Sequence, residues 1–271
     1  MGKLFSRRTF LMGSVGLAAY LLFEEFTLAV KKYNVIIPNL PREFEGFNIL
    51  HISDLHSKWF GDKQEYLLET INEHKFDIVA ITGDLVNKRD PKVEPGLSLI
   101  EGLRDKPIFF VPGNHEWWSG YTIKEPLEAL GVNILENKSF KFSKENSHIW
   151  ISGVDDPYLG KDDLYQSLSQ VDDNEPNILL AHAPNIFDKA SMLKIPLVLV
   201  GHTHGGQIRL PFIGAIVAPG QGLFPKYDYG LFNSENTNMI INGGLGESVL
   251  PIRFNIRSEI VFVSLTSGTS A

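Results

Sequence analysis

The chain has 271 residues, of which 43% are hydrophobic and 21% are charged, so it can bury a sizeable core. With a net charge of −7 at pH 7, the chain lacks the excess of basic residues typical of nucleic-acid-binding proteins, which argues against nucleic-acid binding as its main function. The chain contains no cysteine, which excludes disulfides and thiolate-bound metal centres. No internal repeat or Pro/Gly-rich linker divides it, and this favours one large α/β domain.

The first 30 residues differ in character from the rest. A basic start that includes Arg7 and Arg8 precedes an apolar stretch at 11–23, which is too short for the roughly 20 residues of a membrane span. The letters S-R-R-T-F-L at 6–11 resemble the twin-arginine export signal, with Met12 where lysine is common. We therefore expect export by the twin-arginine machinery to the extracytoplasmic face of the cell membrane or cell wall. The alternative is a short membrane-leaning helix with two incidental arginines.

The boundaries of the folded part follow from this segment. No A-x-A cleavage sequence follows the apolar stretch, so we expect that the segment can remain as an anchor in contact with the membrane. We assign residues 1–30 to this signal or anchor, 44–266 to the folded domain and 267–271 to a short flexible tail.

Strands and helices alternate along the folded part, which predicts an α/β fold class. In chain order, the apolar runs and helical patterns of the first half predict a strand at 47–52, a helix at 64–73, strands at 78–81 and 108–111, a helix at 123–130, and strands at 138–142 and 148–152. Those of the second half predict a helix at 162–170 and strands at 178–181, 197–200, 207–210, 239–241 and 260–265.

Polar side chains follow five of these strands, at the point where each strand ends. They are Asp54 and His56, Asp84, Asn114, His182, and His202 with His204. Because ligands bind at the carboxyl ends of strands in open α/β sheets, we expect these side chains to converge. Any one of them alone would more often be a cap or a surface group, but the set of seven predicts a site.

The residue types indicate the kind of site. Carboxylate and amide oxygens with imidazoles suit Mn²⁺, Fe or Zn²⁺. Two such ions about 3.5–4 Å apart can hold the attacking and leaving oxygens of a displacement at phosphorus. An aspartate, with two oxygens, is the natural bridge between them.

In their order, these segments read D-x-H, G-D, G-N-H-E, H and G-H-x-H between Asp54 and His204. The chain thereby resembles the calcineurin-like metallophosphoesterases. The resemblance implies two β-sheets packed as a sandwich and flanked by helices, with two divalent metal ions, of which Mn²⁺ is the first expectation. It implies metal-binding roles for all seven residues: Asp54, His56 and His204 at the first metal, Asn114, His182 and His202 at the second, and Asp84 between them.

The resemblance also implies how the reaction proceeds. A hydroxide shared by the metals would attack phosphorus in line. His115 would stabilise the phosphoryl oxygens or protonate the leaving oxygen, and Glu116 would orient His115 through a hydrogen bond. We expect Gly205 and Gly206 to allow close backbone packing, with a plain turn as the alternative. Three histidines are expected outside the site: His51 in the first strand, His74 at a helix end and His148 in a polar turn.

The substrate class rests on further resemblances. Asn87 stands where purple acid phosphatases carry tyrosine and protein Ser/Thr phosphatases carry aspartate, which disfavours both. The tracts 201–211 and 243–246 are similar to a bacterial envelope group that contains UDP-2,3-diacylglucosamine pyrophosphatase-like and cell-wall-associated phosphodiesterase-like proteins. This implies a lipid-linked or wall-linked phosphoester as substrate.

Two local features bear on that substrate. The apolar runs 211–219 and 223–225 are either a wall for an acyl chain or ordinary core, and core packing is the favoured interpretation. Arg209 and Arg253 are candidates for binding a non-reacting phosphate, with ordinary surface arginines as the alternative.

Two functions remain open at this point. The first is an exported two-metal phosphoesterase that hydrolyses a phosphodiester or pyrophosphate bond. The second is a metal-stabilised, non-catalytic binding or scaffold module on the same fold. His115 together with seven metal ligands favours the enzyme.

Overall fold

The structure is a computed structural model that describes residues 11–12, 14–16, 20, 24, 27–172, 175–248 and 253–268. The twin-arginine motif predicted at 6–11 and most of the apolar stretch at 11–23 lie outside the described residues, as do residues 269–271 of the predicted tail. Among the residues described, no helix combines the length and the apolar character needed to cross a bilayer.

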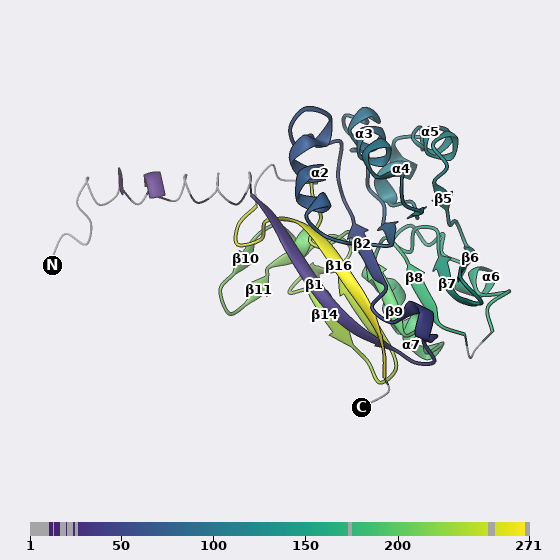
Figure 1. The fold of residues 1–271 in the computed structure, drawn as a ribbon. Coiled ribbons are helices and arrows are strands. Elements are labelled where there is room, and N and C mark those ends of the chain that lie inside the picture. Colours follow the sequence, from purple (N-terminus) through teal and green to yellow (C-terminus); the bar gives the residue numbers. More distant parts are fainter. Residues whose placement is uncertain are drawn as a thin grey trace.

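Two six-stranded sheets face each other and helices cover their outer faces (Figure 1). The first sheet has the order β1-β16-β2-β3-β4-β5. Its strands are β1 (Leu28–Ile37), β16 (Ser258–Ser267), β2 (Asn48–Ile52), β3 (Ile78–Ile81), β4 (Ile108–Phe110) and β5 (Asn133–Ile134). Strands β2 to β5 are parallel, β16 is antiparallel to β2, and β1 is parallel to β16.

The second sheet has the order β14-β15-β9-β8-β7-β6. Its strands are β14 (Gly230–Asn233), β15 (Asn238–Ile241), β9 (Leu197–Val200), β8 (Asn177–Leu180), β7 (Ser147–Gly153) and β6 (Lys138–Lys144). The inner strands are parallel and the two edge strands are antiparallel to their neighbours. Between β9 and β14 lie two small hairpins: β10 (Arg209–Leu210) with β11 (Gly214–Ala215), and β12 (Val217–Ala218) with β13 (Gly222–Leu223).

The helices follow the strands along the chain. They are α2 (Glu65–Asn72), α3 (Glu94–Leu103), α4 (Asn114–Trp118), α5 (Lys124–Ala129), α6 (Leu164–Ser167) and α7 (Phe187–Met192). Short 3₁₀ turns are η1 (Arg42–Phe44), η2 (Asp62–Gln64), η3 (Pro184–Ile186) and η4 (His204–Gly206). The fold is therefore the mixed α/β sandwich with flanking helices that the sequence predicted.

Each inner strand buries both of its faces, which explains why these strands read as nearly continuous apolar runs. In β2, Ile49 packs in the layer between the sheets, whereas Leu50 and Ile52 pack under the helices of the first sheet. The layer between the sheets contains Phe109, Leu180 and other large side chains. A third cluster packs α7 and α6 against the outer face of the second sheet.

Strand β1 extends the folded body beyond the predicted domain. It pairs with β16 over its full length, from Leu28 opposite Ser258 to Ile37 opposite Ser267. Val35 and Ile37 are buried between the sheets, while their neighbour Ile36 is exposed. The folded body therefore begins within the segment 1–30 and extends to Ser267, whereas the predicted domain covered residues 44–266. Strand β1 belongs to the folded body because its alternate residues complete the core.

Two further local predictions differ from the structure. No helix was predicted where α3 lies; Pro95 and Gly96, which disfavour a helix interior, fall in its first turn, where proline is tolerated. His148 lies in β7 and not in a turn, and its ring bonds the Glu175 carboxylate at 2.5 Å.

Candidate metal centre

All seven predicted ligand residues are buried, and each follows a strand that ends at the same side of the sandwich. Asp54 and His56 follow β2, Asp84 follows β3, Asn114 follows β4, His182 follows β8, and His202 and His204 follow β9. Three groups have ligand atoms within 4.8 Å of one another: Asp54 with His56 and His204, His56 with Asp84 and His115, and Asp84 with His182 and His202. The structure therefore brings all seven residues together.

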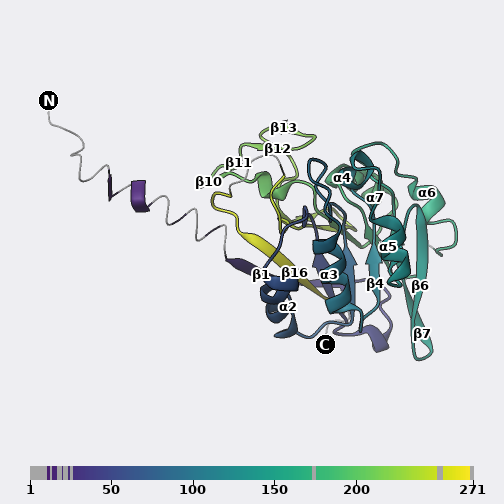
Figure 2. The same ribbon diagram turned by 90° about the horizontal axis from the view of Figure 1, so that it is seen from above.

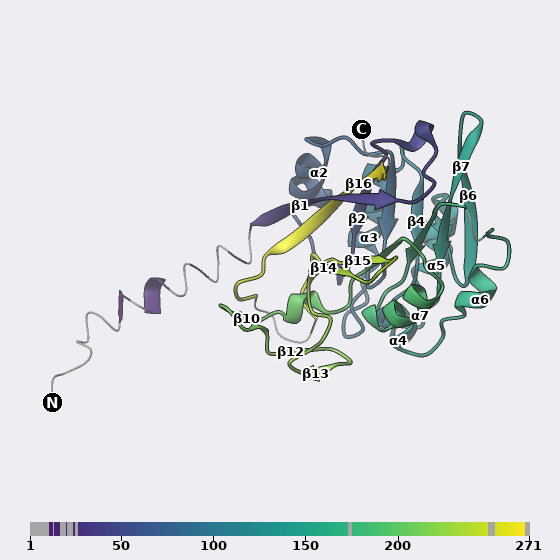
Figure 3. The same cartoon turned by 90° about the horizontal axis from the view of Figure 1, so that it is seen from below.

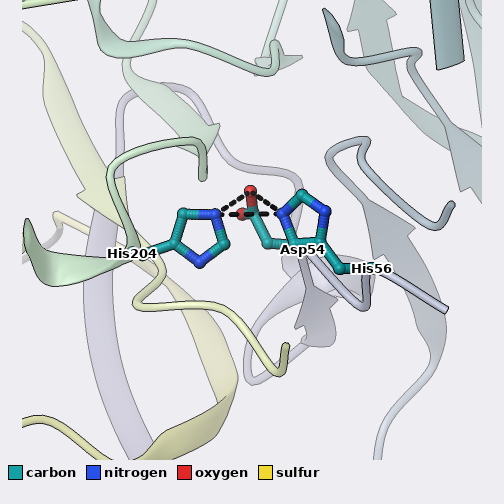
Figure 4. A group of neighbouring side chains, drawn as sticks. All are labelled: Asp54, His56 and His204. Atoms are coloured by element: carbon teal, nitrogen blue, oxygen red, sulfur yellow. Dashed lines mark hydrogen bonds and ion pairs between the residues drawn. The ribbon is translucent and has the colours of Figure 1, made fainter. Parts of the chain in front are cut away.

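The first group is Asp54, His56 and His204, which point at one another in Figure 4. The Nε2 atoms of the two rings are 3.0 Å apart, and Asp54 Oδ1 lies 3.7 Å from His56 Nε2 and 3.3 Å from His204 Nε2. His204 Nδ1 lies 3.2 Å from the Gly246 carbonyl, to which it donates, so its Nε2 carries the lone pair. Asp54 Oδ1 is buried and has no hydrogen-bond partner among the described residues. Two ring nitrogens and an unpaired carboxylate oxygen converge, which is a cation-binding arrangement.

The second group surrounds His182 Nε2. This atom lies 3.1 Å from Asn114 Oδ1, 3.1 Å from His202 Nδ1 and 3.3 Å from Asp84 Oδ2. His182 Nδ1 donates to the Thr82 carbonyl at 2.7 Å, which turns Nε2 toward the other donors. Burial lowers the pKa of His182, but the Asp84 carboxylate outweighs it and raises this pKa well above its usual value, so a metal at Nε2 would replace a proton.

Asp84 lies between the two groups. Its Oδ1 accepts the His115 backbone N–H at 2.8 Å, so only Oδ2 faces the cluster. Oδ2 lies 3.3 Å from His182 Nε2 in one group and 3.7 Å from His56 Nε2 in the other. A single oxygen atom of Asp84 is therefore placed to be shared.

The charge states suit metal binding. Burial lowers the pKa values of His202 and His204 to about 3, so both rings are neutral at pH 7. Burial alone would raise the pKa of Asp84, but the His182, His115 and His56 rings outweigh it, and this pKa falls below its usual range. Neutral imidazoles with ionised carboxylates are the forms that bind cations.

The backbone of the ligand loops is strained. Five ligand residues have left-handed φ angles: Asp54 (53°), His56 (49°), Asp84 (53°), His202 (69°) and His204 (52°). Such a conformation costs on the order of 1–3 kcal/mol per non-glycine residue and persists where the surroundings hold it. Here the Asp54 N–H bonds the Gly83 carbonyl at 3.0 Å and the His56 N–H bonds the Asp84 carbonyl at 2.9 Å, so the loops hold one another.

Two glycines allow the loops to approach. A Cβ on Gly113 would lie 2.3 Å from Asp84 Oδ1, and one on Gly201 would lie 2.2 Å from Asp54 Oδ2. The G-N-H and G-H-x-H motifs need glycine at these positions because any side chain would displace a carboxylate ligand.

Glu116 does not orient His115, contrary to the prediction. Its Oε2 accepts the backbone N–H groups of Asp84 and Gly113, both at 2.8 Å, and its Oε1 accepts that of Leu85 at 2.7 Å and that of Val86 at 3.3 Å. Burial and the Asp84 carboxylate raise the pKa of Glu116 to about 7, against these amide donors, which favour the ionised form. The helix turn that carries Glu116 directs its side chain back to the loop after β3, so it holds that loop in place.

His115 is oriented by a different group. Its Nδ1 accepts the Lys88 N–H at 3.1 Å, so the proton of the neutral ring is on Nε2. Nε2 lies 4.0 Å from Asp84 Oδ2. Burial lowers the pKa of His115 to about 4, and the ring is therefore a neutral N–H donor at pH 7. His115 can donate a hydrogen bond at the edge of the metal centre.

Asp156 is a site residue that the sequence analysis missed. It is buried, its Oδ1 accepts the Tyr158 N–H at 2.9 Å, and its Oδ2 has no hydrogen-bond partner in the part of the chain that the structure describes. Burial raises the pKa of Asp156 to about 6, against the attraction of His182. Asp156 follows β7, so the rule of polar residues at strand ends would have found it. The ring of Tyr158 packs on that of His202, with centroids 4.6 Å apart.

The two arginines considered as phosphate ligands are held by protein groups. Arg253 is buried and donates to the carbonyls of Gly243, Gly244 and Gly246. It thereby supports the same Gly246 carbonyl that accepts from His204. Arg209 donates to Asp228 Oδ2 at 2.8 Å. The burial of Arg253 contradicts the alternative of an ordinary surface arginine.

The three histidines left out of the site stay outside it. His51 is in the core and its Nε2 bonds Thr82 Oγ1 at 2.9 Å. His74 packs edge-on against Phe262, and His148 bonds Glu175. Gly205 and Gly206 have left-handed φ angles, and a Cβ on Gly206 would meet that of Ala215 at 2.4 Å.

The apolar runs after the last motif are largely exposed, which contradicts the favoured interpretation of core packing. Ala215 and Ala218 are buried, but Phe212, Ile213 and Phe224 project into solvent. A cavity of about 400 Å³ lies between the turn of the second hairpin and His202. Its lining includes Tyr158, His202, Gly220 and Lys226.

Comparisons with known proteins agree with this geometry. A family model described as calcineurin-like phosphoesterase matches residues 47–206. A Bacillus subtilis (strain 168) protein named "Uncharacterized metallophosphoesterase YkuE" is 32% identical over 263 residues, which cover 94% of this chain and 91% of that protein. A Helicobacter pylori (strain ATCC 700392 / 26695) protein named "Uncharacterized metallophosphoesterase" is 32% identical over 253 residues, or 89% of this chain and 65% of that protein.

A solved crystal structure shares the fold at 11% identity. Its TM-score is 0.51, and the match covers 81% of this chain and 95% of that chain. A Danio rerio protein named "Transmembrane protein with metallophosphoesterase domain" is 29% identical over 256 residues, which cover 87% of this chain and 57% of that protein. The chain thus spans less than two thirds of the Helicobacter and Danio relatives.

Proposed function

The chain belongs to the calcineurin-like phosphoesterase family and is a metal-dependent phosphoesterase, and from this premise we propose that it hydrolyses a phosphodiester or pyrophosphate bond of an envelope lipid or wall-linked substrate. The observation that carries the proposal is the position of Asp84 Oδ2 between two groups of buried nitrogen and oxygen donors. A scaffold that binds one structural ion does not need such a shared oxygen.

The donors present fit two divalent cations. Within the described part of the chain Asp54 Oδ1 has no hydrogen-bond partner, the His204 tautomer leaves its Nε2 lone pair toward the cluster, and the bond of His182 Nδ1 to Thr82 turns its Nε2 the same way. One ion would be held by Asp54, His56 and His204. The other ion would be held by Asn114, His182 and His202, and Asp84 would contribute to both sites. When bound, two divalent cations lower the pKa of a water and polarise phosphoryl oxygens. The mixture of oxygen and nitrogen donors suits Mn²⁺, with Fe or Zn²⁺ as alternatives.

His115 is the proposed catalytic residue. The Lys88 amide occupies Nδ1, so the ring presents Nε2–H on the side of Asp84 Oδ2. From there it can donate a hydrogen bond to a phosphoryl oxygen or give a proton to the leaving oxygen. Because Nδ1 accepts the Lys88 N–H, the ring does not adopt the opposite tautomer, in which Nε2 would present a lone pair to the site.

The first experiment measures Mn²⁺-dependent hydrolysis of bis-p-nitrophenyl phosphate. We expect His115→Ala to reduce kcat by about 10²–10⁴-fold, since that is the usual contribution of a general acid, with Mn²⁺ content unchanged. Asp84→Asn should lose both activity and bound metal. His74→Ala, which removes a histidine outside the site, is the matched control and should turn over like wild type. Equal, Mn²⁺-dependent turnover by wild type and His115→Ala would refute the role of His115, whereas no Mn²⁺-dependent turnover by wild type above that of Asp84→Asn and His115→Ala would favour the non-catalytic scaffold.

The envelope location and the substrate are part of the proposal. The motif at 6–11, the tracts 201–211 and 243–246, and the exposed apolar hairpins beside the cavity support them. Replacing Arg7 and Arg8 by lysine should retain the protein in the cytoplasm, as fractionation and mass spectrometry of the N-terminus would show. Release of nucleotide from UDP-linked acyl sugars, compared with that from cyclic nucleotides, tests the lipid-linked class.

A further inference from the structure

The chain carries no charged residue between Arg209 and Lys226. An uncharged run of this kind is usually buried. Here it forms the two hairpins β10–β11 and β12–β13, whose strands are only two residues long. Figures 2 and 3 show these hairpins at the margin of the molecule, apart from the two large sheets.

The tip of the first hairpin and the open end of the second carry the largest apolar side chains of the run. Phe212 and Ile213 form the first tip, and Leu223 and Phe224 end the second hairpin. Ile213 is 60% exposed, Leu223 70% and Phe224 71%, and Phe212 is fully exposed. Exposed apolar groups gathered on one side of a protein mark an interaction surface. Strands of two residues offer no edge long enough for the addition of a partner strand.

We propose that the first tip, with Phe212 and Ile213, and the open end of the second hairpin, with Leu223 and Phe224, insert into the surface of a lipid bilayer and hold the metal centre against it. Lys226 lies two residues after Phe224; its side chain is 70% exposed, and its Nζ lies 3.7 Å from Asp188 Oδ1. A cation beside projecting aromatic and aliphatic side chains suits a bilayer, because the apolar groups enter the acyl region and the ammonium remains among anionic headgroups. A folded protein partner would instead require a matched, shape-complementary surface.

The N-terminal segment identifies lipid as the occupant of this face. The ring of Tyr20 packs against that of Phe254, with centroids 5.7 Å apart. Phe254 forms a bridge with Ile208 at the base of the first hairpin. The start of β1 and β10 lie on the same side of the molecule in Figures 1, 2 and 3. Tyr20 therefore lies beside the base of the first hairpin, next to the start of β1.

The same hairpins border the metal centre. Pro219 and Gly220, in the turn of the second hairpin, line the cavity together with His202. A Cβ on Gly220 would lie 2.9 Å from the Tyr158 ring and 3.8 Å from His202 Nε2, so the turn lies against the centre. A lipid headgroup phosphate could reach the metals while its chains stay in the bilayer; this last step rests on the proposed function.

The absence of cysteine from the chain allows a direct test. Phe224→Cys in the full-length protein creates a single site for an environment-sensitive nitrobenzoxadiazole label. Tyr165→Cys is the matched control, since Tyr165 is 79% exposed on α6, on the other side of the molecule (Figure 1). Both labelled proteins are mixed with vesicles of phosphatidylglycerol and phosphatidylethanolamine, with and without spin-labelled acyl chains. Hydrolysis of bis-p-nitrophenyl phosphate is measured in parallel.

We expect the label at position 224 to shift to shorter wavelength, gain intensity and be quenched by the spin labels, while the label at position 165 does not respond. The proposal is overturned if the label at 224 stays in water while the protein sediments with the vesicles, because the N-terminal segment alone would then bind them. An equal response at both positions overturns it as well. Insertion at 224 by a protein that does not hydrolyse the ester would support membrane docking and refute the proposed hydrolysis.

Discussion

At the scale of single residues, the metal centre depends on buried carboxylates that do not themselves face the metals. Glu116 accepts amide protons from the loop after β3 and from Gly113, and so holds Asp84 and Asn114 in register. A carboxylate is needed there because both of its oxygens must accept, and an amide side chain has only one acceptor atom.

We therefore expect Glu116→Gln to destabilise the protein. Whichever oxygen the NH₂ group replaces, two of the four buried amides lose their acceptor, and a buried donor without a partner costs about 1–3 kcal/mol. The loss of unfolding free energy should thus be at least about 2 kcal/mol in urea denaturation. Glu125→Gln, on the exposed face of α5, is the control and should change stability by less than about 0.5 kcal/mol. Equal stability of both variants would mean that Glu116 does not hold the loop.

Asp156 supplies a pH-dependent prediction. Burial raises the pKa of Asp156 from its ordinary value of 3.8 to about 6, so its carboxyl form is favoured in the folded protein. Its contribution to stability is complete below pH 4 and is lost as the pH rises through 6. Asp156→Asn keeps an acceptor for the Tyr158 N–H but cannot ionise. In metal-free protein its stability relative to wild type should rise between pH 4 and pH 7.5 by about 2–3 kcal/mol, from 1.36 kcal/mol per pKa unit.

The measurement is urea unfolding in EDTA at several pH values. Asp105→Asn, at an exposed position, should run parallel to wild type across this range. A difference between Asp156→Asn and wild type that does not change with pH would contradict the burial of an ionisable group at this position.

At the scale of elements, β1 shows how an edge strand completes the sandwich. It pairs with β16 and its alternate side chains face opposite ways, so Ile37 is buried in the layer between the sheets while Ile36 is 60% exposed. Loss of β1 would open that layer at Val35 and Ile37.

Ile36 and Ile37 form a matched pair for testing this role. Ile37→Ala should cost about 2–5 kcal/mol of unfolding free energy, because it leaves a cavity in the core. Ile36→Ala should cost less than about 1 kcal/mol, since it removes only an exposed strand side chain. Both are measured by denaturant unfolding. Similar losses for the two variants would show that β1 does not pack in the observed register.

At the scale of the whole molecule, the metal centre joins loops from both halves of the chain. The first sheet supplies Asp54, Asp84 and Asn114, and the second supplies His182, His202 and His204. Carboxylates and rings are desolvated there, and five ligand residues have strained backbones. Metal ions that bind only the folded form should therefore stabilise the two halves together.

We expect Mn²⁺ to raise the thermal midpoint and EDTA to lower it. Ligand at 100 times its Kd adds about 2.7 kcal/mol for one site. Asp84→Asn, which removes the shared oxygen, should lose most of this increment, whereas His115→Ala should keep it. Calorimetry with and without Mn²⁺ measures the thermal midpoints of wild type and of both variants. An identical Mn²⁺ response in Asp84→Asn would place the metals elsewhere.

The sequence by itself determined the strands and the set of residues at their ends. The runs at 78–81 and 197–200 are strands with the predicted limits, because a short, wholly apolar run can be satisfied only by burial of both faces. The seven ligand residues could be predicted because each lies immediately after such a run, and parallel strands bring their ends to one edge. Helix α3 could not be predicted from the sequence, because the effect of Pro95 on a helix depends on where the helix begins.

Only the tertiary structure decided which partner each polar group meets and which apolar surface stays exposed. The tautomer of His115 depends on the Lys88 amide, the role of Glu116 on the loop after β3, and the burial of Arg253 on three glycine carbonyls. The exposure of Phe212 and Phe224, and the place of β1 beside β16, likewise depend on segments distant in the chain. Residue type and local pattern carry no information on such contacts, because hydrogen bonding and burial are properties of the packed whole.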